Sequence, residues 1–599
     1  MKGTSVHVVA TAGHVDHGKS TLLRALTGME PDRWAEERRR GLTIDLGFVW
    51  TSDPDVAFVD VPGHERFISN MLAGVGPVPA VLFVVAADGG WQVQSEEHLA
   101  VLDTLGVRHG VLAVTRADLA DPAPVLAEAA ERLGRTSLGG VEAVAVSAVT
   151  GQGLPELRAA LGRLTAALPV PDPSADVRLW IDRAFTVDGR GVVVTGTLGR
   201  GTLRTAQTLE IAGTGDLVEV RGLHSLQVAY EEVRGPARVA VNLRGRAAAG
   251  LRRGDALLDP ERWAEVGEVD VRLDETHAPA ARARVARADG AAARMPGQLI
   301  WHIGSAAVPA RVRPLGSGTA RVTLSRPLPL RLGDRALLRD PGNRDVYGAT
   351  LLDVRPPALD RRGAARARAA ELATLTGAPD GAAELRRRGL MRRADMLAMG
   401  ATPPGPPVAG DWLADGEHWA GLRGRLLRLV EEHDRAHPED PGLTPEAVRQ
   451  ALGLPDRALV DALAAGTSLR RRRGRLAAAL PVLPERLRGA VAAVRRELAG
   501  APFAAPDAGR LAELGLDARA LAIAEAAGAL LRVQPGVVLL PGALEEAVRI
   551  LAGLAQPFTV AQARQAMGTS RRVALAVLQR LDGLGRTRRV DDAHRVILG

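Results

Sequence analysis

A phosphate-binding loop close to the N-terminus constrains this chain more than any other feature. The stretch VHVVATAGHVDHGKSTLLRALTG reads as a strand, a glycine-bounded loop and an amphipathic helix. Its centre matches the template G-x-x-x-x-G-K-S, in which backbone N–H groups surround a β-phosphate, the lysine reaches the β- and γ-oxygens, and the serine hydroxyl ligates Mg²⁺. The predicted nucleotide-binding residues of this segment are Gly13, His14, Val15, Asp16, His17, Gly18, Lys19, Ser20 and Thr21.

The lysine of this loop stands out against the rest of the chain. The sequence contains 77 lysine and arginine residues, and Lys2 and Lys19 are the only lysines. A compact ammonium fits between the loop and the phosphate oxygens, whereas the planar guanidinium of arginine is too bulky for this position. The retention of lysine at position 19 therefore argues against a chance glycine-rich turn.

The composition limits what else the chain can be. A chain of 599 residues is too long for one hydrophobic core, so several domains are expected. The absence of cysteine excludes disulfides, thiol catalysis and Cys-ligated zinc. No apolar run approaches the ~20 residues of a membrane span, and the first residues lack the pattern of a signal peptide, so we expect a cytoplasmic protein without membrane contact. The net charge of +8 favours a polyanionic partner.

Two further segments carry residues suited to a metal ion and a γ-phosphate. In VAFVDVPGHERF an apolar strand ends at Asp60, whose carboxylate can hold Mg²⁺ through water, and the Gly63 N–H can approach a γ-phosphate. The segment RRRGLTIDLGF contains Thr43, whose hydroxyl and carbonyl can reach the metal and the γ-phosphate. On its own this segment would read as a charged loop entering a strand. The predicted metal ligands are Ser20, Thr43 and Asp60.

The next motifs predict which base is bound. AVLFVVAADGG and HGVLAVTRAD are buried-strand patterns with polar ends, typical of a parallel sheet whose ligands bind at the strand C-termini. The second strand leads into Thr115, Arg116 and Asp118, and the later loop VSAVTGQG contains Ser147 and Ala148. A carboxylate at position 118 would accept hydrogen bonds from N1–H and the 2-amino group of guanine, and adenine has neither donor. The expected ligands are therefore GTP and GDP.

Taken together, GHVDHGKST, GLTIDLGF, DVPGHERF and AADGGWQVQSEEHL resemble the motifs of a translational GTPase related to elongation factor Tu. GLTIDLGF, the later stretch WIDRAFTVDGRGVVVTGTLGRGTL and a long C-terminal extension resemble, more narrowly, the selenocysteine-specific (SelB-type) elongation factors. The resemblance implies that His64 is catalytic and positions the attacking water when the ribosome triggers GTP hydrolysis. A surface histidine without a role is the alternative.

The base-binding motif departs from the family pattern Asn-Lys-x-Asp at two positions. Arg116 replaces the lysine, and its guanidinium can still lie over the base. Thr115 replaces the asparagine, so an amide gives way to a hydroxyl with less hydrogen-bonding capacity. The departures put nucleotide affinity in question more than the preference for guanine.

Changes in residue composition and in hydrophobic pattern along the chain predict its domains. PVPDPSADVRLW is a Pro- and Asp-rich linker, and the segments that follow alternate apolar and polar residues between glycine turns, which is typical of small β-barrels. We predict a multidomain fold: an α/β P-loop GTP-binding domain (1–170), two antiparallel β-barrels (175–262 and 263–357), and an array of about four α+β winged-helix modules (361–599).

The resemblance implies that the first barrel holds the aminoacyl end of a tRNA. A selenol is more acidic than a thiol or the serine hydroxyl, so a cationic pocket would favour selenocysteine over the serine that precedes it on the same tRNA. By similarity the pocket residues are Asp182 and Arg183 in WIDRAF and Arg238 in GPARVAVNL, with the arginines facing the selenolate and Asp182 orienting them or the α-amino group. From spacing alone, a salt-bridged barrel rim is the alternative.

The C-terminal part reads as helices followed by basic hairpins. FTVAQARQAMGTSRRVALAVLQRLDGLGRTRRVDDAHRVIL fits a winged helix-turn-helix, and we place the last module at 545–599. Arg571 and Arg572 lie on its predicted recognition helix, and Arg588 and Arg589 on its wing, where they suit phosphate contacts. A solvated basic face of a helical bundle is the alternative. The resemblance implies an mRNA stem-loop, the selenocysteine insertion element, rather than DNA.

These expectations describe a GTP-dependent delivery factor. It would bind GTP or GDP with Mg²⁺, carry selenocysteyl-tRNA to the ribosome at a recoded UGA codon, and be tethered to the mRNA stem-loop by its tail, as a monomer. Two alternatives stay open. A translational GTPase carrying initiator tRNA would not need the tail, and a nucleic-acid-binding regulator gated by a GTPase switch would have no purpose for two tRNA-binding barrels.

Overall fold

The chain divides into two compact units in a computed structural model. Residues 1–381 with 393–404 form the first unit, and residues 382–392 with 405–599 form the second. The structure describes residues 7–31, 46–62, 78–189, 191–274, 295–316, 318–342, 345–437, 440–472, 474–478 and 483–598.

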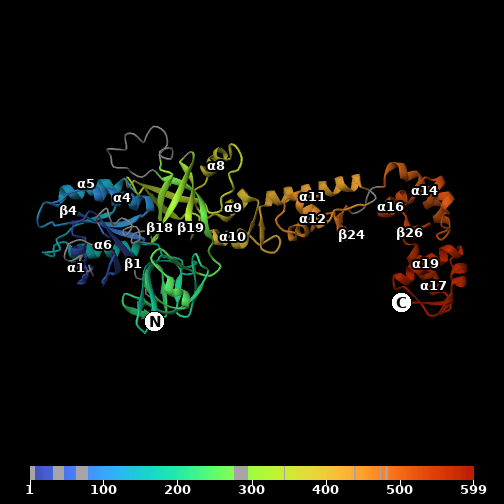
Figure 1. Ribbon diagram of the computed structural model, residues 1–599, viewed down its shortest axis with the longest axis horizontal. Coiled ribbons are helices and arrows are strands. Elements are labelled where there is room, and N and C mark those ends of the chain that lie inside the picture. Colours follow the sequence, from blue (N-terminus) through green and yellow to red (C-terminus); the bar gives the residue numbers. More distant parts are fainter. Residues whose placement is uncertain are drawn as a thin grey trace. The chain divides into compact units, whose positions relative to one another are not determined.

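The N-terminal domain is a six-stranded sheet with helices on both faces (Figure 1). Five strands are parallel and one edge strand is antiparallel, in the order β2-β3-β1-β4-β5-β6. All seven residues of the central strand β4 are buried, which explains its unbroken apolar sequence AVLFVVA. The elements are β1 (His7–Ala12), α1 (Lys19–Thr27), β2 (Gly47–Ser52), β3 (Asp55–Asp60), β4 (Ala80–Ala86), α4 (Val93–Leu105), β5 (His109–Thr115), α5 (Ala123–Gly134), β6 (Glu142–Ala145) and α6 (Leu154–Ala167).

The next domain is a closed antiparallel barrel of six strands. Its strands follow one another as β10-β15-β7-β8-β14-β11, and β11 pairs with β10 to close the ring. The alternating burial of β14 shows why the sequence ARVAVNLR forms such a strand, because every second residue enters the barrel core. The elements are β7 (Arg178–Val187), β8 (Gly191–Leu198), β9 (Thr202–Arg204), β10 (Thr208–Ile211), β11 (Leu217–Ser225), β12 (Val228–Tyr230), β13 (Glu232–Arg234), β14 (Ala237–Arg244), η2 (Arg246–Gly250) and β15 (Ala256–Leu258).

A second closed barrel follows, with strand order β16-β19-β18-β17-β20-β21. Trp301 is its largest fully buried side chain. The elements are β16 (Glu265–Asp274), β17 (Gln298–Ile303), β18 (Ala306–Gly316), β19 (Thr319–Pro329), β20 (Arg335–Arg339) and β21 (Val346–Asp353). An α/β domain followed by two antiparallel barrels confirms this part of the predicted fold class.

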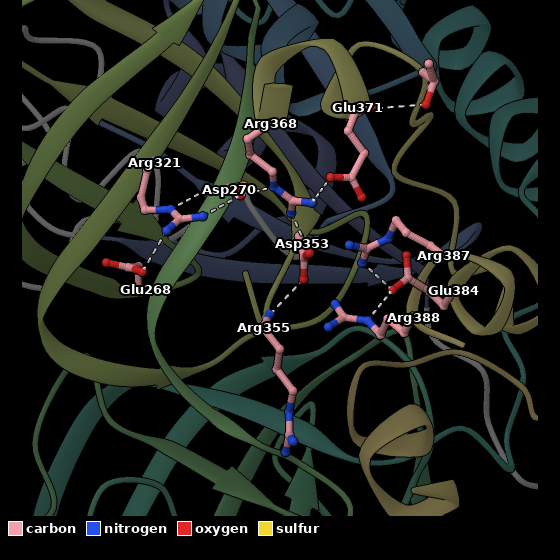
Figure 2. A network of polar contacts seen from close by, with 11 residues as sticks. Glu268, Asp270, Arg321, Asp353, Arg355, Arg368, Glu371, Glu384, Arg387 and Arg388 are labelled. Carbon is pink, nitrogen blue, oxygen red and sulfur yellow. Dashed lines mark hydrogen bonds and ion pairs between the residues drawn. The ribbon is translucent and has the colours of Figure 1, made fainter. Parts of the chain in front are cut away.

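A buried charge network fastens helix α8 (Ala364–Leu372) to this second barrel (Figure 2). The Arg368 guanidinium donates to Asp270 at 2.7 Å, to Asp353 at 2.5 Å and to Glu371 at 2.8 Å. Arg321 approaches the other oxygen of Asp270 at 2.7 Å. Asp270 and Asp353 are fully buried, so the two arginines compensate charges that water does not reach. Helix α8, which lies beyond the predicted start of the tail at residue 361, belongs to the first unit.

Replacing Arg368 by methionine should destabilise the second barrel by about 3–5 kcal/mol, because two buried carboxylates lose a charged partner. Amide hydrogen exchange of β16 and β19 measures the local opening free energy. Arg366→Met is the matched control, since Arg366 lies on the same helix with its side chain exposed. Equal exchange in the two variants would show that the network contributes nothing to stability.

The second unit repeats one arrangement of helices followed by a short β-hairpin. In the last module a third strand joins the hairpin, giving the order β28-β30-β29. This repetition confirms the predicted winged-helix array. The elements of the C-terminal part are α9 (Gly381–Arg388), β22 (Leu390–Arg392), α10 (Arg393–Ala398), which lies in the first unit, and β23 (Trp412–Ala414); α11 (Gly416–Ala436), α12 (Pro445–Leu452), α13 (Ala458–Ala464), β24 (Arg470–Arg472) and β25 (Arg475–Ala477); α14 (Glu485–Gly500), α15 (Ala508–Glu513), α16 (Ala518–Ala526), β26 (Leu531–Gln534) and β27 (Val537–Leu539); α17 (Ala543–Ala552), β28 (Phe558–Thr559), α18 (Val560–Ala566), α19 (Arg571–Gly583), β29 (Thr587–Arg589) and β30 (His594–Ile597).

Side-chain caps mark the helix starts of the last module. Thr559 accepts from the backbone N–H of Gln562, whose side chain accepts from Thr559 in return, forming a capping box at α18. Ser570 accepts from the N–H of Val573 at the start of α19. None of the helices that the structure describes is both long and apolar enough to cross a membrane.

Candidate functional site

The phosphate-binding loop lies between β1 and α1, at the carboxyl edge of the parallel sheet. Gly13 has φ +127°, and a Cβ there would lie 2.1 Å from the carbonyl oxygen of Val84, so only glycine fits against β4. Gly18 caps α1 with φ +77°. The Lys19 ammonium reaches back across the loop and donates to the carbonyls of Gly13 at 3.0 Å and His14 at 2.7 Å. Burial lowers the pKa of Lys19 to about 8, against the opposing effect of Asp60.

A set of oxygen ligands lies beside this lysine. Ser20 Oγ donates to one carboxylate oxygen of Asp60 at 2.7 Å, and Thr11 Oγ1 donates to the other at 2.8 Å. Asp60 is fully buried at the end of β3. Hydroxyl and carboxylate oxygens are the donors that Mg²⁺ prefers, so Ser20 and Asp60 fit the predicted metal site. Thr43, the third predicted ligand, lies outside the described residues, as do Gly63 and His64.

Helix α4 supplies two residues that the sequence analysis missed. His98 Nδ1 accepts a hydrogen bond from the Gly13 N–H at 3.0 Å, and Gln94 Oε1 accepts from the Val15 N–H at 3.2 Å. Both side chains of α4 therefore fix the backbone of the phosphate-binding loop by hydrogen bonds. Their spacing of four residues, on a helix that directly follows the buried strand β4, is the signal in the sequence that could have identified them.

Two histidines beside the loop, His98 and His17, are neutral. Burial lowers the pKa of His98 to about 3, and the nearby Lys19 contributes in the same direction. Burial, together with His14 and Lys19, lowers the pKa of His17 to about 4. The neutral ring of His98 is what leaves Nδ1 available as an acceptor for Gly13.

Because of these two histidines, we expect the N-terminal domain without nucleotide to lose stability in acid. Below pH 6.5 the unfolded chain takes up protons on His98 and His17 that the folded chain rejects, so stability falls as the pH drops toward 3–4. Each histidine adds a slope of about 1.4 kcal/mol per pH unit in this range. In His98→Asn the amide oxygen replaces Nδ1 as acceptor and does not titrate. The free energy of unfolding, measured with urea between pH 6 and pH 4.5, should therefore depend on pH less steeply than in the wild type, by the slope of one histidine. An unchanged slope in His98→Asn would contradict this prediction.

The base-binding segment contacts the phosphate loop directly. Thr115 Oγ1 donates to the His17 carbonyl at 2.7 Å, so the hydroxyl that replaces the family's asparagine still ties the two segments together. The Arg116 guanidinium pairs with Asp88 at 3.0 Å and donates to the Asp16 carbonyl. The Arg116 side chain therefore connects the loop after β5 to the phosphate-binding loop.

The loop after β6 completes this edge of the sheet. The N–H of Ala117 donates to the carbonyl of Val146 at 3.2 Å, which brings the two base-binding segments side by side. Ser147 is fully buried, and its Oγ accepts from the backbone N–H groups of Val149 and Thr150. Ala148 follows Ser147 in this loop. The Asp118 side chain is exposed and has no hydrogen bond within the described part of the chain. Its carboxylate is open to a ligand.

The three predicted residues of the first barrel converge. The register of β7 and β8 shifts between Ile181 and Arg183, so Asp182 and Arg183 together oppose Thr195. Neighbouring residues of a regular strand face opposite sides, and a β-bulge re-aims them. Arg238 binds Asp182 through both terminal nitrogens, one of them at 2.7 Å.

Phe48 of β2 lies under both arginines of this cluster. The Arg238 guanidinium carbon lies 3.8 Å from the ring centroid, and that of Arg183 lies 5.5 Å away. Arg183 also donates to the Leu46 carbonyl at 2.7 Å. Asp182 is 7% exposed, and two guanidinium groups lie on the same aromatic ring beside it. Guanidinium donors gathered in this way suit an anionic ligand.

The predicted RNA-binding arginines differ in how firmly they are held. Arg571 begins α19 and Arg588 lies on β29, and both side chains are exposed without a hydrogen bond or ion pair to the described residues. Arg572 donates to the Gly536 carbonyl at 2.8 Å, and Arg589 pairs with Asp592 at 3.0 Å. The first two are therefore the more accessible to a polyanion.

Comparisons with known proteins agree with these features. The family model described as elongation factor Tu GTP binding domain matches residues 4–167, and that described as elongation factor SelB, winged helix, matches residues 549–596. The chain is 35% identical over 476 residues to a selenocysteine-specific elongation factor of Escherichia coli (strain K12), covering 76% of this chain and 74% of the relative.

Further matches differ in how much they cover. The chain is 37% identical over 349 residues to a selenocysteine-specific elongation factor of Desulfomicrobium baculatum, and the match spans 55% of this chain and 53% of that relative. A solved structure titled as a bacterial selenocysteine-specific elongation factor EF-Sec superposes over the full length of both chains with a TM-score of 0.69 at 23% identity. This last similarity supports the fold.

Proposed function

Because the chain belongs to the family of selenocysteine-specific elongation factors, we propose that it hydrolyses GTP to deliver selenocysteyl-tRNA to the ribosome at a recoded UGA codon. The single observation that carries the substrate assignment is the cluster of Asp182, Arg183 and Arg238 in the first barrel. The proposed setting is the cytoplasm, where ribosomes work, and the proposed form is a monomer.

Each residue of the nucleotide site has its own proposed role. Lys19 and the loop N–H groups bind the β- and γ-phosphates, and Asp118 reads the guanine edge. Ser20, Asp60 and Thr43 would hold Mg²⁺, which when bound neutralises charge on the phosphate oxygens. We assign to Gly63 the sensing of the γ-phosphate and to His64 the orientation of the attacking water. Loss of the γ-phosphate would then release the segments that carry Thr43 and Gly63 and end tRNA binding.

Discrimination between selenocysteine and serine follows from charge. The selenol of selenocysteine is ionised at neutral pH, and the hydroxyl of serine is not. Arg238 is oriented by two hydrogen bonds to Asp182, and Arg183 brings a second guanidinium group to the same ring of Phe48. A selenolate near the two guanidinium groups would gain an attraction that neutral serine lacks. The exposed Arg571 and Arg588 are the proposed contacts for the mRNA stem-loop.

The test compares two esters on the same tRNA. With GTP, the chain should slow hydrolysis of the ester bond of selenocysteyl-tRNA, and seryl-tRNA should be protected at least about 10-fold less well, one desolvated ion contact being worth roughly 1.5–3 kcal/mol. Arg183→Gln should reduce this selectivity. Arg246→Gln, an exposed arginine elsewhere on the same barrel, should keep it. Equal protection of both esters by the wild-type chain would refute the pocket assignment.

A further inference from the structure

The first unit contains a groove that is rich in cationic hydrogen-bond donors, away from the nucleotide site and the barrel cluster. Two adjoining cavities of about 290 and 450 Å³ share Arg200, Asp334 and Arg335 among their lining residues. Together they have the size of small-ligand sites, roughly 300–1,000 Å³. The arginine groove, as we name it, is defined by Arg178, Arg200, Arg272, Arg331 and Arg335.

The carboxylates of the groove are already engaged. Asp334 receives two hydrogen bonds from Arg178, at 2.6 and 2.8 Å, and Asp176 receives one from Arg331 at 2.6 Å. Both acidic side chains that line the described part of the groove are therefore held by arginine. Burial lowers the pKa of Arg331, Asp176 partly offsets this, and the nearby Arg178 and Arg200 act in the same direction as burial.

Two of the arginines retain capacity for an anion. Arg335 donates to the carbonyl of Thr104 at 3.0 Å, a neutral acceptor that leaves the guanidinium charge uncompensated. Arg200 is exposed at the groove edge, and its side chain makes no hydrogen bond to the part of the chain that the structure describes. Both side chains line both cavities.

Two ring nitrogens add to this excess of donors. His302, which is 6% exposed, lines the smaller cavity, and its buried Nε2 has no hydrogen-bond partner within the described residues. Trp263 lines the same cavity, and its buried Nε1 is likewise without a partner there. Burial lowers the pKa of His302 to about 4, with Arg339 acting in the same direction, so the ring is neutral. A buried polar atom without a partner indicates an occupant that supplies one.

We propose that the arginine groove binds a small diphosphate anion, either inorganic pyrophosphate or the phosphate tail of a nucleotide. Phosphate oxygens only accept hydrogen bonds, which matches a lining of guanidinium, indole and imidazole donors. Guanidinium binds two phosphate oxygens at once, and a diphosphate has enough oxygens to reach donors of both cavities.

The lining favours a free anion over an RNA strand. Single strands are held by aromatic faces on which bases stack. The Trp263 ring is already covered, because the Arg331 guanidinium carbon lies 3.6 Å and that of Arg178 lies 4.7 Å from its centroid. Those two arginine side chains are only 7% and 15% exposed, so a polymer backbone lying on the surface would not reach them.

Calorimetric titration of inorganic pyrophosphate into the full chain tests this proposal. The P-loop is first filled with one equivalent of GDP, so that no excess nucleotide diphosphate competes for the groove, and free Mg²⁺ is held constant. We expect one site with a dissociation constant below about 1 mM. Arg200→Gln should weaken it at least about 5-fold through loss of one charge-assisted contact, and Arg335→Gln at least as much. Arg246→Gln is the matched control and should bind as the wild type does. Far-UV circular dichroism checks that each variant folds.

Each outcome decides the question. Equal affinity in Arg200→Gln and Arg246→Gln would overturn the proposal, since the Arg200 side chain makes no hydrogen bond within the described residues whose loss could mask the effect. Absence of pyrophosphate binding would overturn it too. If a single-stranded oligonucleotide bound with this arginine dependence and pyrophosphate did not, the occupant would be RNA and the free-anion assignment would be wrong. The titration uses no aminoacyl-tRNA, so its result is separate from that of the ester-protection assay.

Discussion

Replacing Lys19 by arginine is expected to weaken binding of both GTP and GDP at least about 100-fold, equivalent to about 2.7 kcal/mol. The ammonium is 6% exposed and lies within 3.0 Å of two loop carbonyls. A guanidinium carries the same charge but is wider and planar, so it cannot occupy this place without displacing the loop. The loss of charge-assisted hydrogen bonds to the phosphates accounts for the magnitude.

The experiment separates the shape of the cation from its charge, because Lys19→Arg keeps the positive charge and changes only the group that carries it. Competition against a fluorescent GDP analogue gives the two dissociation constants. Arg24→Lys, the reverse exchange on the exposed side of the same helix, is the control and should change neither constant. Nucleotide binding by Lys19→Arg within fivefold of wild type would mean that the ammonium is not the phosphate ligand.

Local patterns were sufficient to predict the architecture. The run AVLFVVA predicts a strand buried on both faces, and β4 is such a strand. Alternation in ARVAVNLR predicts a half-buried strand, and β14 alternates accordingly. The fold class and the family are confirmed, whereas the roles of all the individual site residues stay predictions. Thr43, Gly63 and His64 also lie outside the described residues.

Contacts between distant segments were not predictable in the same way. The four-residue spacing of Gln94 and His98 predicts that they share a helix face, but it does not show that the His98 ring accepts from Gly13, 85 residues away, because this depends on how α4 packs across β1. The same holds for α8, whose Arg368 reads as one more exposed arginine in an Ala-rich helix. Its burial arises only when β16 and β21 bring Asp270 and Asp353 beneath it.

The bulge at Asp182 illustrates an intermediate case. The family resemblance names Asp182, Arg183 and Arg238, yet a regular strand would place the first two on opposite faces. The register shift against Thr195 resolves this conflict by letting both side chains reach the same cluster. Phe48, which both guanidinium groups cover, comes from a different domain and carries no signal in its own segment.

Asp118→Asn should exchange the preferred base of the nucleotide. A carboxylate accepts hydrogen bonds from the N1–H and the 2-amino group of guanine, whereas an amide presents one acceptor and one donor. The donor would face the 2-amino group of GTP and repel it, but it would match the carbonyl that xanthine carries at the same carbon. A site built for hydrogen bonding rejects mismatched ligands by as much as roughly 10⁴-fold. We therefore expect the affinity for GTP to fall at least about 100-fold and the affinity for xanthosine triphosphate to rise correspondingly.

The exposed position of Asp118 makes this variant informative, since its side chain supports no described contact that the substitution would remove. Asp121→Asn, three residues further on, is the matched control. The Asp121 carboxylate accepts from the Ala123 N–H at 3.0 Å, and an amide oxygen can do the same, so both nucleotides should bind as in the wild type. Competition with each triphosphate measures the exchange. If Asp118→Asn weakened GTP and xanthosine triphosphate equally, the carboxylate would be shaping the loop, and the discrimination of guanine would have to come from the backbone beside Ser147 and Ala148.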